Sequence, residues 1–494
     1  MGYKANMYLD YQVLHDEVTG SGIYATLHLP EKVTHFLVDC GLFQEKSYLE
    51  RNESLPFDPK ELSYVFLTHI HSDHCARIPM LYNKGYKGDV YTSYISKELL
   101  PITLDNSCKI ITSNATKSHK LPIYTTDDLE ETYAHVLGFD YNKFIKVDDN
   151  ISIMFLENAH LLGAACIYIR ISYPGEQDIN LLFTGDYSPT NTFFEINEFP
   201  EEILNAPVTI IQETTYGHMH SREIKNTLEQ NVKDAIAQNK TIVFPAFAIG
   251  RYQEMEYLVQ TWCKKGIIPK RYQICLDGVM PFQYNDKFKK FSFILKQNTK
   301  DFVPKDAKRV VTAMPEEKNK KEETKKKKKK KKKDKIKVIT RETVLKSQKP
   351  KIIISTSGMG TYGPSNEYIT SLKNRKDVLI HFLGYLAEGT LGRYLQEELK
   401  KDDYSTFNDT EEHADIKFTN ELSRHAKKDQ LLAFLKKFRK INCLLLNHGN
   451  FSSSEKYSNY VKERLNIKDI EILNSKTIYR VGAYGFIKSY KKSA

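Results

Sequence analysis

The sequence lacks the cysteine pattern of a disulfide framework or of a thiolate metal site. Its seven cysteines are odd in number, scattered along the chain and never in CxxC spacing, which argues against both. A run of about 18 apolar residues is also missing, so we predict no membrane span. The first residues, MGYKANMYLDYQ, lack the apolar segment of a secretory signal. We therefore expect a cytoplasmic protein with reduced thiols.

Excess positive charge is scarce outside one segment. Residues 318–337 hold 14 lysines against three acidic residues, a surplus equal to the formal net charge of +11 of the whole chain. Nine of these lysines, 325–333, are consecutive. Such a run repels itself and buries nothing, so we expect a disordered Lys-rich insertion over about 301–348. Because the rest of the chain is about neutral, the basic pI alone does not indicate nucleic-acid binding.

Apolar residues, in contrast, are plentiful and regularly arranged. They make up 40% of the chain and include 31 Tyr and 25 Phe, enough for a sizeable core. Over the first two hundred residues, short apolar runs end at or near a His or an Asp: HFLVDC, SYVFLTH, ISIMFLENAH and NLLFTGD. From about residue 207, strand patterns alternate with helix patterns. This alternation predicts a parallel α/β domain.

The densest group of polar residues is HIHSDH, directly after the apolar run SYVFLT. Six residues supply His69, His71, Asp73 and His74. Imidazole suits zinc, and a carboxylate can join or bridge two ions. His69 and His71, two apart on an extended loop, can face one ion while Asp73 and His74 turn toward a second. Three of only 15 histidines fall here, so a chance surface loop explains the motif poorly.

Single histidines and aspartates recur at later strand ends. They are His160, Asp186, His425 and His448. Each alone is a weak signal, since a lone His is more often a satisfied or exposed residue than a ligand. Together they supply what a two-metal hydrolase requires: about four ligands per ion, one shared carboxylate and an open position for water.

The order of these motifs is typical of a known family. VDCGLFQ, LTHIHSDH, ENAHLLGAA and FTGD closely resemble the metallo-β-lactamase superfamily. EVTGS, ETTYG, PAFAIGRYQE, TSGMGTYGP, GYLAEGTLGR, SRHA and NHG resemble its β-CASP branch. That branch includes ribonuclease J, the endonuclease subunit of the cleavage and polyadenylation complex, and compact bacterial relatives, which this chain resembles most in length. The resemblance implies an α/β fold, with a metallo-β-lactamase αββα sandwich (1–217 and 401–494) and an inserted parallel α/β β-CASP domain (218–400).

The resemblance also implies a set of metal ligands. One zinc ion would be held by His69, His71 and His160, and the other by Asp73, His74 and His448, with Asp186 as the bridge. Mn²⁺ would be a substitute for zinc. Asp39 matches the first motif of the family, a group that orients the ligand loop.

The catalytic residues implied by the resemblance are Asp73, Asp186, Glu213 and His425. Two ions can lower the pKa of a water toward neutrality and neutralise charge on the phosphate. His425, held by Glu213, is the candidate general acid for the leaving oxygen, because a carboxylate partner favours imidazolium.

Four residues are candidates for RNA contact. Arg251 offers a guanidinium fork to phosphate. Ser357 and Gly358 offer a hydroxyl and an approachable backbone N–H. Ser423 lies two residues before His425. Turn chemistry alone would also account for Gly358.

We therefore expect a zinc-dependent ribonuclease that acts on single-stranded RNA, as a monomer or a homodimer without a membrane segment. Both endonuclease and 5′-exonuclease action remain open. One alternative is a DNA-acting β-CASP nuclease, although relatives of the Artemis type carry Val where this chain has His448. Another is a non-catalytic RNA-binding scaffold subunit, which would be expected to have lost ligands. A small-molecule hydrolase of the superfamily would lack the inserted domain.

Overall fold

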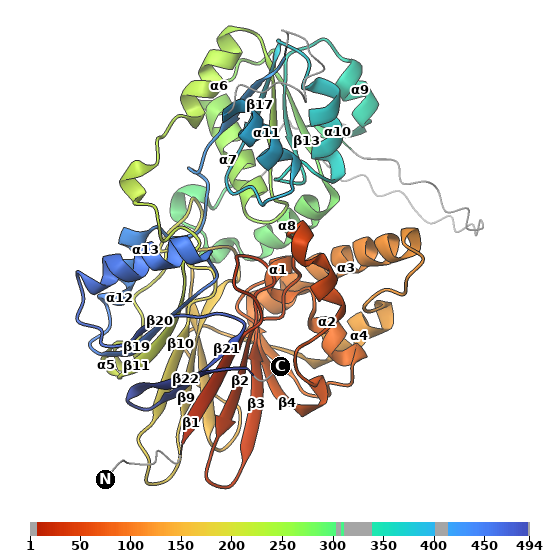
Figure 1. The fold of residues 1–494 in the computed structure, drawn as a ribbon. Helices are drawn as coiled ribbons and strands as arrows, with labels where there is room; N and C mark the ends of the chain where they lie inside the picture. The colour runs from red at the N-terminus through yellow and green to blue at the C-terminus, as the bar shows by residue number, and fades with distance from the viewer. Residues whose placement is uncertain (1–6, 303–307, 311–337, 401–412, 493–494) are drawn as a thin grey trace. The chain divides into compact units, whose positions relative to one another are not determined.

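The computed structural model describes residues 7–302, 308–310, 338–400 and 413–492 (Figure 1). The chain divides into two compact units. Unit 1 comprises Met1–Ile224, Asp286–Lys300 and Arg424–Ala494, and unit 2 comprises Lys225–Asn285 and Asp301–Ser423. The lysine run 325–333 lies outside the described residues.

Unit 1 contains an eight-stranded sheet that is antiparallel at one side and parallel at the other. The parallel side runs from β3 to β6. In sheet order its strands are β22 (Gly485–Lys491), β21 (Thr477–Gly482), β1 (Tyr8–Val13), β2 (Ile23–His28), β3 (Val33–Val38), β4 (Leu62–Phe66), β5 (Val90–Ser93) and β6 (Val136–Phe139).

A second, seven-stranded sheet faces the first across a shared core. In sheet order its strands are β20 (Ile470–Ile472), β19 (Ile441–Asn447), β11 (Val208–Glu213), β10 (Ile179–Phe183), β9 (Ala165–Ile171), β8 (Ile151–Glu157) and β7 (Ile145–Lys146). Strand β9 shows how the core forms: Ile167 and Ile169 point between the sheets, whereas Cys166 and Tyr168 point to the outer layer. Because side chains alternate along a strand, a strand buried on both faces is apolar throughout.

Helices complete the outer layers of this sandwich. In Figure 1 one group lies beside the first sheet and the other beside the second. The first group is α1 (Ser72–Cys75), α2 (Ile78–Asn83), α3 (Tyr94–Lys117) and α4 (Thr126–His135); the second is α5 (Glu201–Asn205), α12 (Lys428–Leu435) and α13 (Phe451–Lys462). Short 3₁₀ turns lie at Lys46–Glu53, Pro59–Glu61, Ser221–Glu223, Ser292–Ile294 and Gln297–Thr299. The αββα architecture predicted from the sequence is thus present.

Unit 2 is built on a parallel sheet covered on both faces. Its strands, in sheet order, are β15 (Val338–Ile339), β14 (Lys308–Val310), β13 (Gln273–Asp277), β16 (Lys351–Ser355), β12 (Thr241–Pro245), β17 (Val378–Phe382) and β18 (Asp415–Phe418). Helices α6 (Leu228–Ala237) and α7 (Arg251–Lys264) pack on one face; α9 (Arg341–Lys346), α10 (Gly363–Leu372) and α11 (Leu391–Lys400) pack on the other. Double coverage explains the near-continuous apolar strands. Helix α8 (Val279–Lys290) contributes residues to both units.

The segment 301–348, expected as a loop, contains regular elements where the structure describes it. These are β14, β15 and α9. Thr340 begins α9 by accepting a hydrogen bond from the Thr343 backbone, a local capping signal that the neighbouring lysines obscure in the sequence. Among the described residues, no helix has the length and apolar character needed to cross a membrane.

Candidate metal centre

The candidate ligands of unit 1 follow the ends of strands that share one edge of each sheet. His69 and His71 follow β4, and Asp73 and His74 lie on the short helix α1. In the second sheet, β8, β10 and β19 point the same way. These strands are followed by His160, Asp186 and His448. A rigid sheet edge thus fixes the backbone from which each donor extends.

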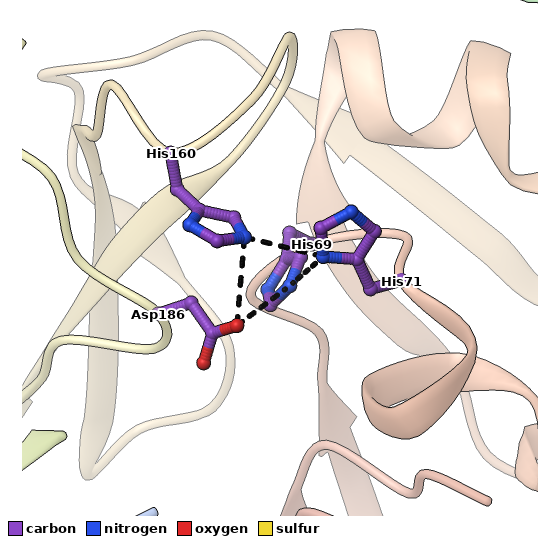
Figure 2. A group of neighbouring side chains, drawn as sticks. All are labelled: His69, His71, His160 and Asp186. Carbon is purple, nitrogen blue, oxygen red and sulfur yellow. Dashed lines mark hydrogen bonds and ion pairs between the residues drawn. The ribbon is translucent and has the colours of Figure 1, made fainter. Parts of the chain in front are cut away.

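The first cluster contains His69, His71, His160 and Asp186, whose donor atoms all lie within 4.8 Å of one another (Figure 2). His71 Nδ1 is 3.2 Å from His69 Nε2 and 3.2 Å from His160 Nε2. Asp186 Oδ2 is 3.6 Å from His69 Nε2 and 3.5 Å from His160 Nε2. Three ring nitrogens and one carboxylate oxygen therefore converge on a common point.

A second cluster lies on the other side of Asp186. It contains Asp73, His74 and His448. The Nε2 atoms of His74 and His448 are 3.1 Å apart. Asp186 Oδ1 lies 3.2 Å from His74 Nε2 and 3.2 Å from His448 Nδ1. Asp186 thus presents one oxygen to each cluster, as a bridging carboxylate would.

The chemistry of this donor set fits divalent cations. Asp186 is 2% exposed, and its Oδ1 has no hydrogen-bond partner among the described residues. Burial holds the pKa of His69 and His160 well below the ordinary value and also lowers the pKa of His448. Burial alone would raise the pKa of Asp186, but the neighbouring histidines outweigh it and hold that pKa well below its usual range. Neutral imidazoles around an ionised carboxylate are the protonation states that bind a metal.

Asp39 and Thr68 orient the ligands from behind. Asp39 Oδ1 accepts a hydrogen bond from the Thr68 backbone N–H at 2.8 Å, and Oδ2 accepts one from the Thr68 hydroxyl at 2.7 Å. Asp39 Oδ2 also lies 2.8 Å from His74 Nδ1, which turns His74 Nε2 toward the cluster. Burial alone would lower the pKa of His74, but Asp186 and Asp39 raise it well above the ordinary value.

Close backbone packing explains a glycine of the first motif. An added Cβ at Gly41 would lie 1.5 Å from the carbonyl oxygen of Asp73. The backbones of the Asp39 loop and of the HIHSDH loop therefore approach each other in a way that only glycine permits. This contact couples the orienting group to the ligand loop.

His425 and Glu213 form a pair beside Asp186. His425 Nδ1 lies 3.0 Å and 3.1 Å from the two carboxylate oxygens of Glu213, and its Nε2 lies 3.7 Å from Asp186 Oδ2. Burial would lower the pKa of His425, but Glu213 and Asp186 outweigh it and raise the pKa. Glu213 is held in turn by the backbone N–H groups of Tyr187 and Thr215. The pair can hold a proton close to the carboxylate of Asp186.

Three side chains that support the site were not among the sequence predictions. Thr68 holds Asp39, as described above. The Thr215 hydroxyl lies 3.2 Å from His448 Nδ1. Lys427, 4% exposed, donates from Nζ to the His425 carbonyl at 2.7 Å and lies over the ring of Tyr216. Only adjacency to the motif residues, in THIH, ETT and RHAK, signals them in the sequence.

The predicted RNA contacts all lie in unit 2. Arg251 begins α7, with its guanidinium 4.6 Å from the centre of the Phe247 ring. An added Cβ at Gly358 would lie 2.6 Å from that same ring, so Arg251 and Gly358 share a neighbour at the carboxyl ends of β12 and β16. The Ser357 hydroxyl donates to the Tyr362 carbonyl at 3.2 Å. Ser423 is buried near the end of unit 2.

Comparison with known families matches three consecutive parts of the chain. Residues 32–228 match the metallo-beta-lactamase superfamily, residues 252–395 the Beta-Casp domain, and residues 413–473 the Zn-dependent metallo-hydrolase RNA specificity domain. Together the three matches cover most of the sequence. Membership of a metallo-hydrolase family implies divalent-metal binding, which agrees with the donor clusters.

Several characterised proteins are similar along much of this chain. Transcription termination factor FttA of Methanosarcina mazei is 26% identical over 483 residues, covering 92% of this chain and 68% of that protein. The FttA of Methanocaldococcus jannaschii is 27% identical, covering 88% of this chain and 66% of that protein. Ribonuclease TTHA0252 of Thermus thermophilus is 29% identical over 230 residues, 46% of this chain and 49% of that protein. The chain spans about two thirds of the length of these FttA relatives.

Proposed function

The chain belongs to the β-CASP branch of the metallo-β-lactamase superfamily, and on this premise we propose that it is a zinc-dependent ribonuclease acting on single-stranded RNA in processing or decay. One observation supports this most directly. A group of seven donors, five of them buried, adjoins a histidine whose raised pKa suits it to carry a proton. A scaffold subunit would have no use for that combination, whereas hydrolysis needs both parts.

The proposed metal content is two zinc ions, with Mn²⁺ as a substitute. His69, His71 and His160 would hold one ion, and Asp73, His74 and His448 the other. Asp186 would serve both, since each of its oxygens faces one cluster. Asp39 would keep His74 in its ligand orientation. Bound ions would supply Lewis acidity that activates water near neutral pH and neutralises charge on the phosphate.

Side chains of the protein would then supply the proton that the leaving group needs. His425 keeps Nδ1 against Glu213, which leaves Nε2 directed toward Asp186. From Nε2 the imidazolium would donate a proton to the 3′-oxygen as its bond to phosphorus breaks. Glu213 would favour the charged form before donation and hold the ring in one orientation afterwards. The Lys427 contact with the His425 carbonyl fixes the backbone of this residue.

Binding of the RNA chain would involve the cluster in unit 2. Arg251, Ser357 and Gly358 lie around Phe247 and Tyr362 at the carboxyl ends of parallel strands, where ligands often bind in such sheets. A guanidinium there suits phosphate. Ser423 would contribute from the segment that leads into His425. We also propose a cytoplasmic location and leave monomer and homodimer as alternatives.

The similarity to proteins named transcription termination factor favours a second candidate role. The same hydrolysis would then act on nascent transcripts. Cleavage of RNA within a transcribing complex, compared with cleavage of the same RNA free in solution, distinguishes the two roles. A clear preference for the transcribing complex supports termination, and equal rates support general processing or decay.

Digestion of three RNA substrates tests the proposal. Purified protein with its metal content measured is incubated with 5′-labelled linear, 3′-labelled linear and circular RNA, and with DNA of the same sequence. We expect cleavage of RNA with close to two zinc ions per chain, lost on chelation and restored by zinc. Cleavage of the circle identifies endonuclease action. Absence of RNA cleavage by zinc-loaded protein would overturn the proposal, and cleavage of DNA alone would replace it.

A further inference from the structure

A hollow of about 470 Å³ lies in unit 1 at the edge of the second sheet opposite to the metal centre. It opens where β19 begins, at Ile441, whereas His448 follows the other end of that strand. Seven residues at about 3.3 Å each place the two ends roughly 20 Å apart. The hollow is therefore distinct from the donor clusters.

Cations dominate the charged residues that line this hollow. They are Lys436, Arg439, Lys440 and Lys468, against one acidic residue, Asp469. None of the four cations forms a side-chain ion pair or hydrogen bond with another described residue. Lys436 caps the end of α12, where a cation complements the helix dipole. The other three have no such structural role, and the single carboxylate of Asp469 leaves the lining with an excess of positive charge that an anion would neutralise.

The lining of the hollow suits a ligand with both charged and flat groups. Apolar side chains, among them Phe438 and Ile441, also line it. Tyr484, at the turn between β21 and β22, lines the rim and is 81% exposed. An exposed aromatic beside unpaired cations is the combination that binds single-stranded nucleic acid, through stacking and phosphate contacts. Two copies of this chain would bring like charges together if they met through this surface.

We propose that this basic hollow, lined by Arg439, Lys440, Lys468 and Tyr484, is an auxiliary site for the sugar-phosphate backbone of RNA. The identity of this ligand rests on the proposed function. The site lies too far from the metal centre to touch the scissile bond. It would therefore anchor a distant part of a long substrate and leave short substrates unaffected.

Binding of a phosphorothioate RNA, which keeps its charge and resists hydrolysis, tests this inference. Fluorescence anisotropy with an RNA of about 30 nucleotides compares the full-length zinc-loaded protein with Arg439→Ala/Lys440→Ala/Lys468→Ala over a range of salt. We expect affinity at low salt to fall at least about 10-fold and the slope of log affinity against log salt to flatten by about 2, since single strands release about 0.7 ion per phosphate contact. Tyr484→Ala should weaken affinity without changing the salt slope.

Two matched variants distinguish binding at this hollow from a general effect of the net charge of the protein. Lys84→Ala/Lys109→Ala/Lys117→Ala removes three exposed lysines, one directly after α2 and two on α3 of the same unit, and should change affinity by less than about 2-fold. Arg439→Lys/Lys440→Arg/Lys468→Arg keeps the charge and should retain binding. Equal losses in the two alanine variants would overturn the inference. Unchanged RNA affinity in the first alanine variant, together with loss of self-association in sedimentation, would assign the hollow to a second copy instead.

The binding assay does not depend on hydrolysis, so the two proposals fail separately. Protein that cleaves RNA but binds it equally well without the three cations would retain the proposed function and lose the auxiliary site. If the wild-type protein does not cleave RNA but the variant binds RNA more weakly than the wild type, the auxiliary site is retained and the proposed function is lost. Cleavage of a very short RNA should proceed at the wild-type rate in the variant.

Discussion

Both units bury a carboxylate at or just beyond the carboxyl end of a strand, but they neutralise it in different ways. In unit 2, Asp277 at the end of β13 is 1% exposed. Its oxygen Oδ2 lies 2.8 Å from Arg341 Nε and accepts a hydrogen bond from Tyr368 at 2.9 Å. In unit 1, the ionic partners of Asp186 among the described residues are all histidines.

This comparison distinguishes a buried carboxylate with a structural role, Asp277, from one whose surroundings suit an external ligand, Asp186. Unit 2 supplies its own permanent cation, so its buried carboxylate is satisfied by the chain alone. Unit 1 surrounds its carboxylate with imidazoles, most of which burial keeps neutral. A buried anion without a fixed cation is costly, and external metal ions would remove that cost. Loss of metal should therefore affect unit 1 and leave unit 2 intact.

The largest expected effect comes from removing a donor in unit 1. Asp73→Ala should reduce RNA cleavage by at least ~10³, because the loss of one ion removes both water activation and charge neutralisation. Metal content should fall from about two ions toward one. Steady-state kinetics and elemental analysis of the dialysed protein measure both.

Trp262 provides the control for this variant. It is the only tryptophan of the chain, lies on α7 of unit 2 and is 3% exposed, so its fluorescence reports the unfolding of unit 2. The urea midpoint of this signal should be the same in Asp73→Ala and in the wild type. A large shift would mean that the two units do not differ in their dependence on metal.

The converse change tests the permanent cation of unit 2. Arg341→Met leaves Asp277 buried without its cation and should lower the free energy of unfolding of unit 2 by about 3–5 kcal/mol. Zinc content should stay unchanged. Arg375→Met is the matched control, because its pair with Asp377 is largely exposed and should contribute less than about 1 kcal/mol. Equal urea midpoints of the Trp262 signal in the two variants would contradict this account.

The family and the fold class predicted from the sequence are confirmed, and the reason lies in contiguous motifs. A strand followed at once by HIHSDH carries both the secondary structure and the chemistry in one short segment. The predicted ligand roles and domain boundaries stay predictions, although the structure does bring His74 and His448 together across 374 positions.

Features that depend on distant parts of the chain were not predicted. Arg341 meets Asp277 across 64 positions, and it lies in the segment expected to be a loop. Nothing near either residue indicates the pair, since an Arg and an Asp are common at strand and helix ends. The auxiliary hollow is likewise formed by residues from α12, the loop before β20 and the β21–β22 turn, whose lysines and arginine are unremarkable one by one.

Substitution of His425 should have a smaller effect, and it should distinguish proton transfer from metal binding within unit 1. His425→Ala should slow RNA cleavage by about 10²–10³ while the zinc content stays at the wild-type value, as expected for loss of a general acid. An aryl phosphodiester, whose leaving group needs no proton, should be affected much less. Glu213→Gln should show the same pattern more weakly, because it keeps a hydrogen-bonding partner without the charge. Equal losses on both substrates would indicate that His425 positions the RNA or holds metal.

The smallest effect concerns a histidine of unit 2 whose hydrogen-bond partners among the described residues include no carboxylate. His381 is fully buried, with Nε2 3.0 Å from the Asn231 amide nitrogen and Nδ1 3.2 Å from the Phe382 carbonyl. The neutral ring satisfies both contacts, because it accepts at Nε2 and donates at Nδ1. Burial lowers the pKa of His381 from 6.5 to about 4.

The sign of the pH dependence follows from this lowered pKa. The unfolded chain binds the proton near pH 6.5 and the folded unit only near pH 4, so the stabilisation is complete above pH 6.5 and is lost progressively as the pH falls to about 4. Each pH unit between the two values is about 1.4 kcal/mol, which gives a loss of at most about 3.5 kcal/mol. Urea unfolding followed by the fluorescence of Trp262 should show this decline in stability with or without zinc. In unit 1, by contrast, the zinc content should fall over the same pH range, because protons compete with zinc for the imidazoles. His381→Gln, which keeps an acceptor but does not titrate, should flatten the Trp262 curve alone. An unchanged curve in that variant would assign the pH dependence of unit 2 to another group.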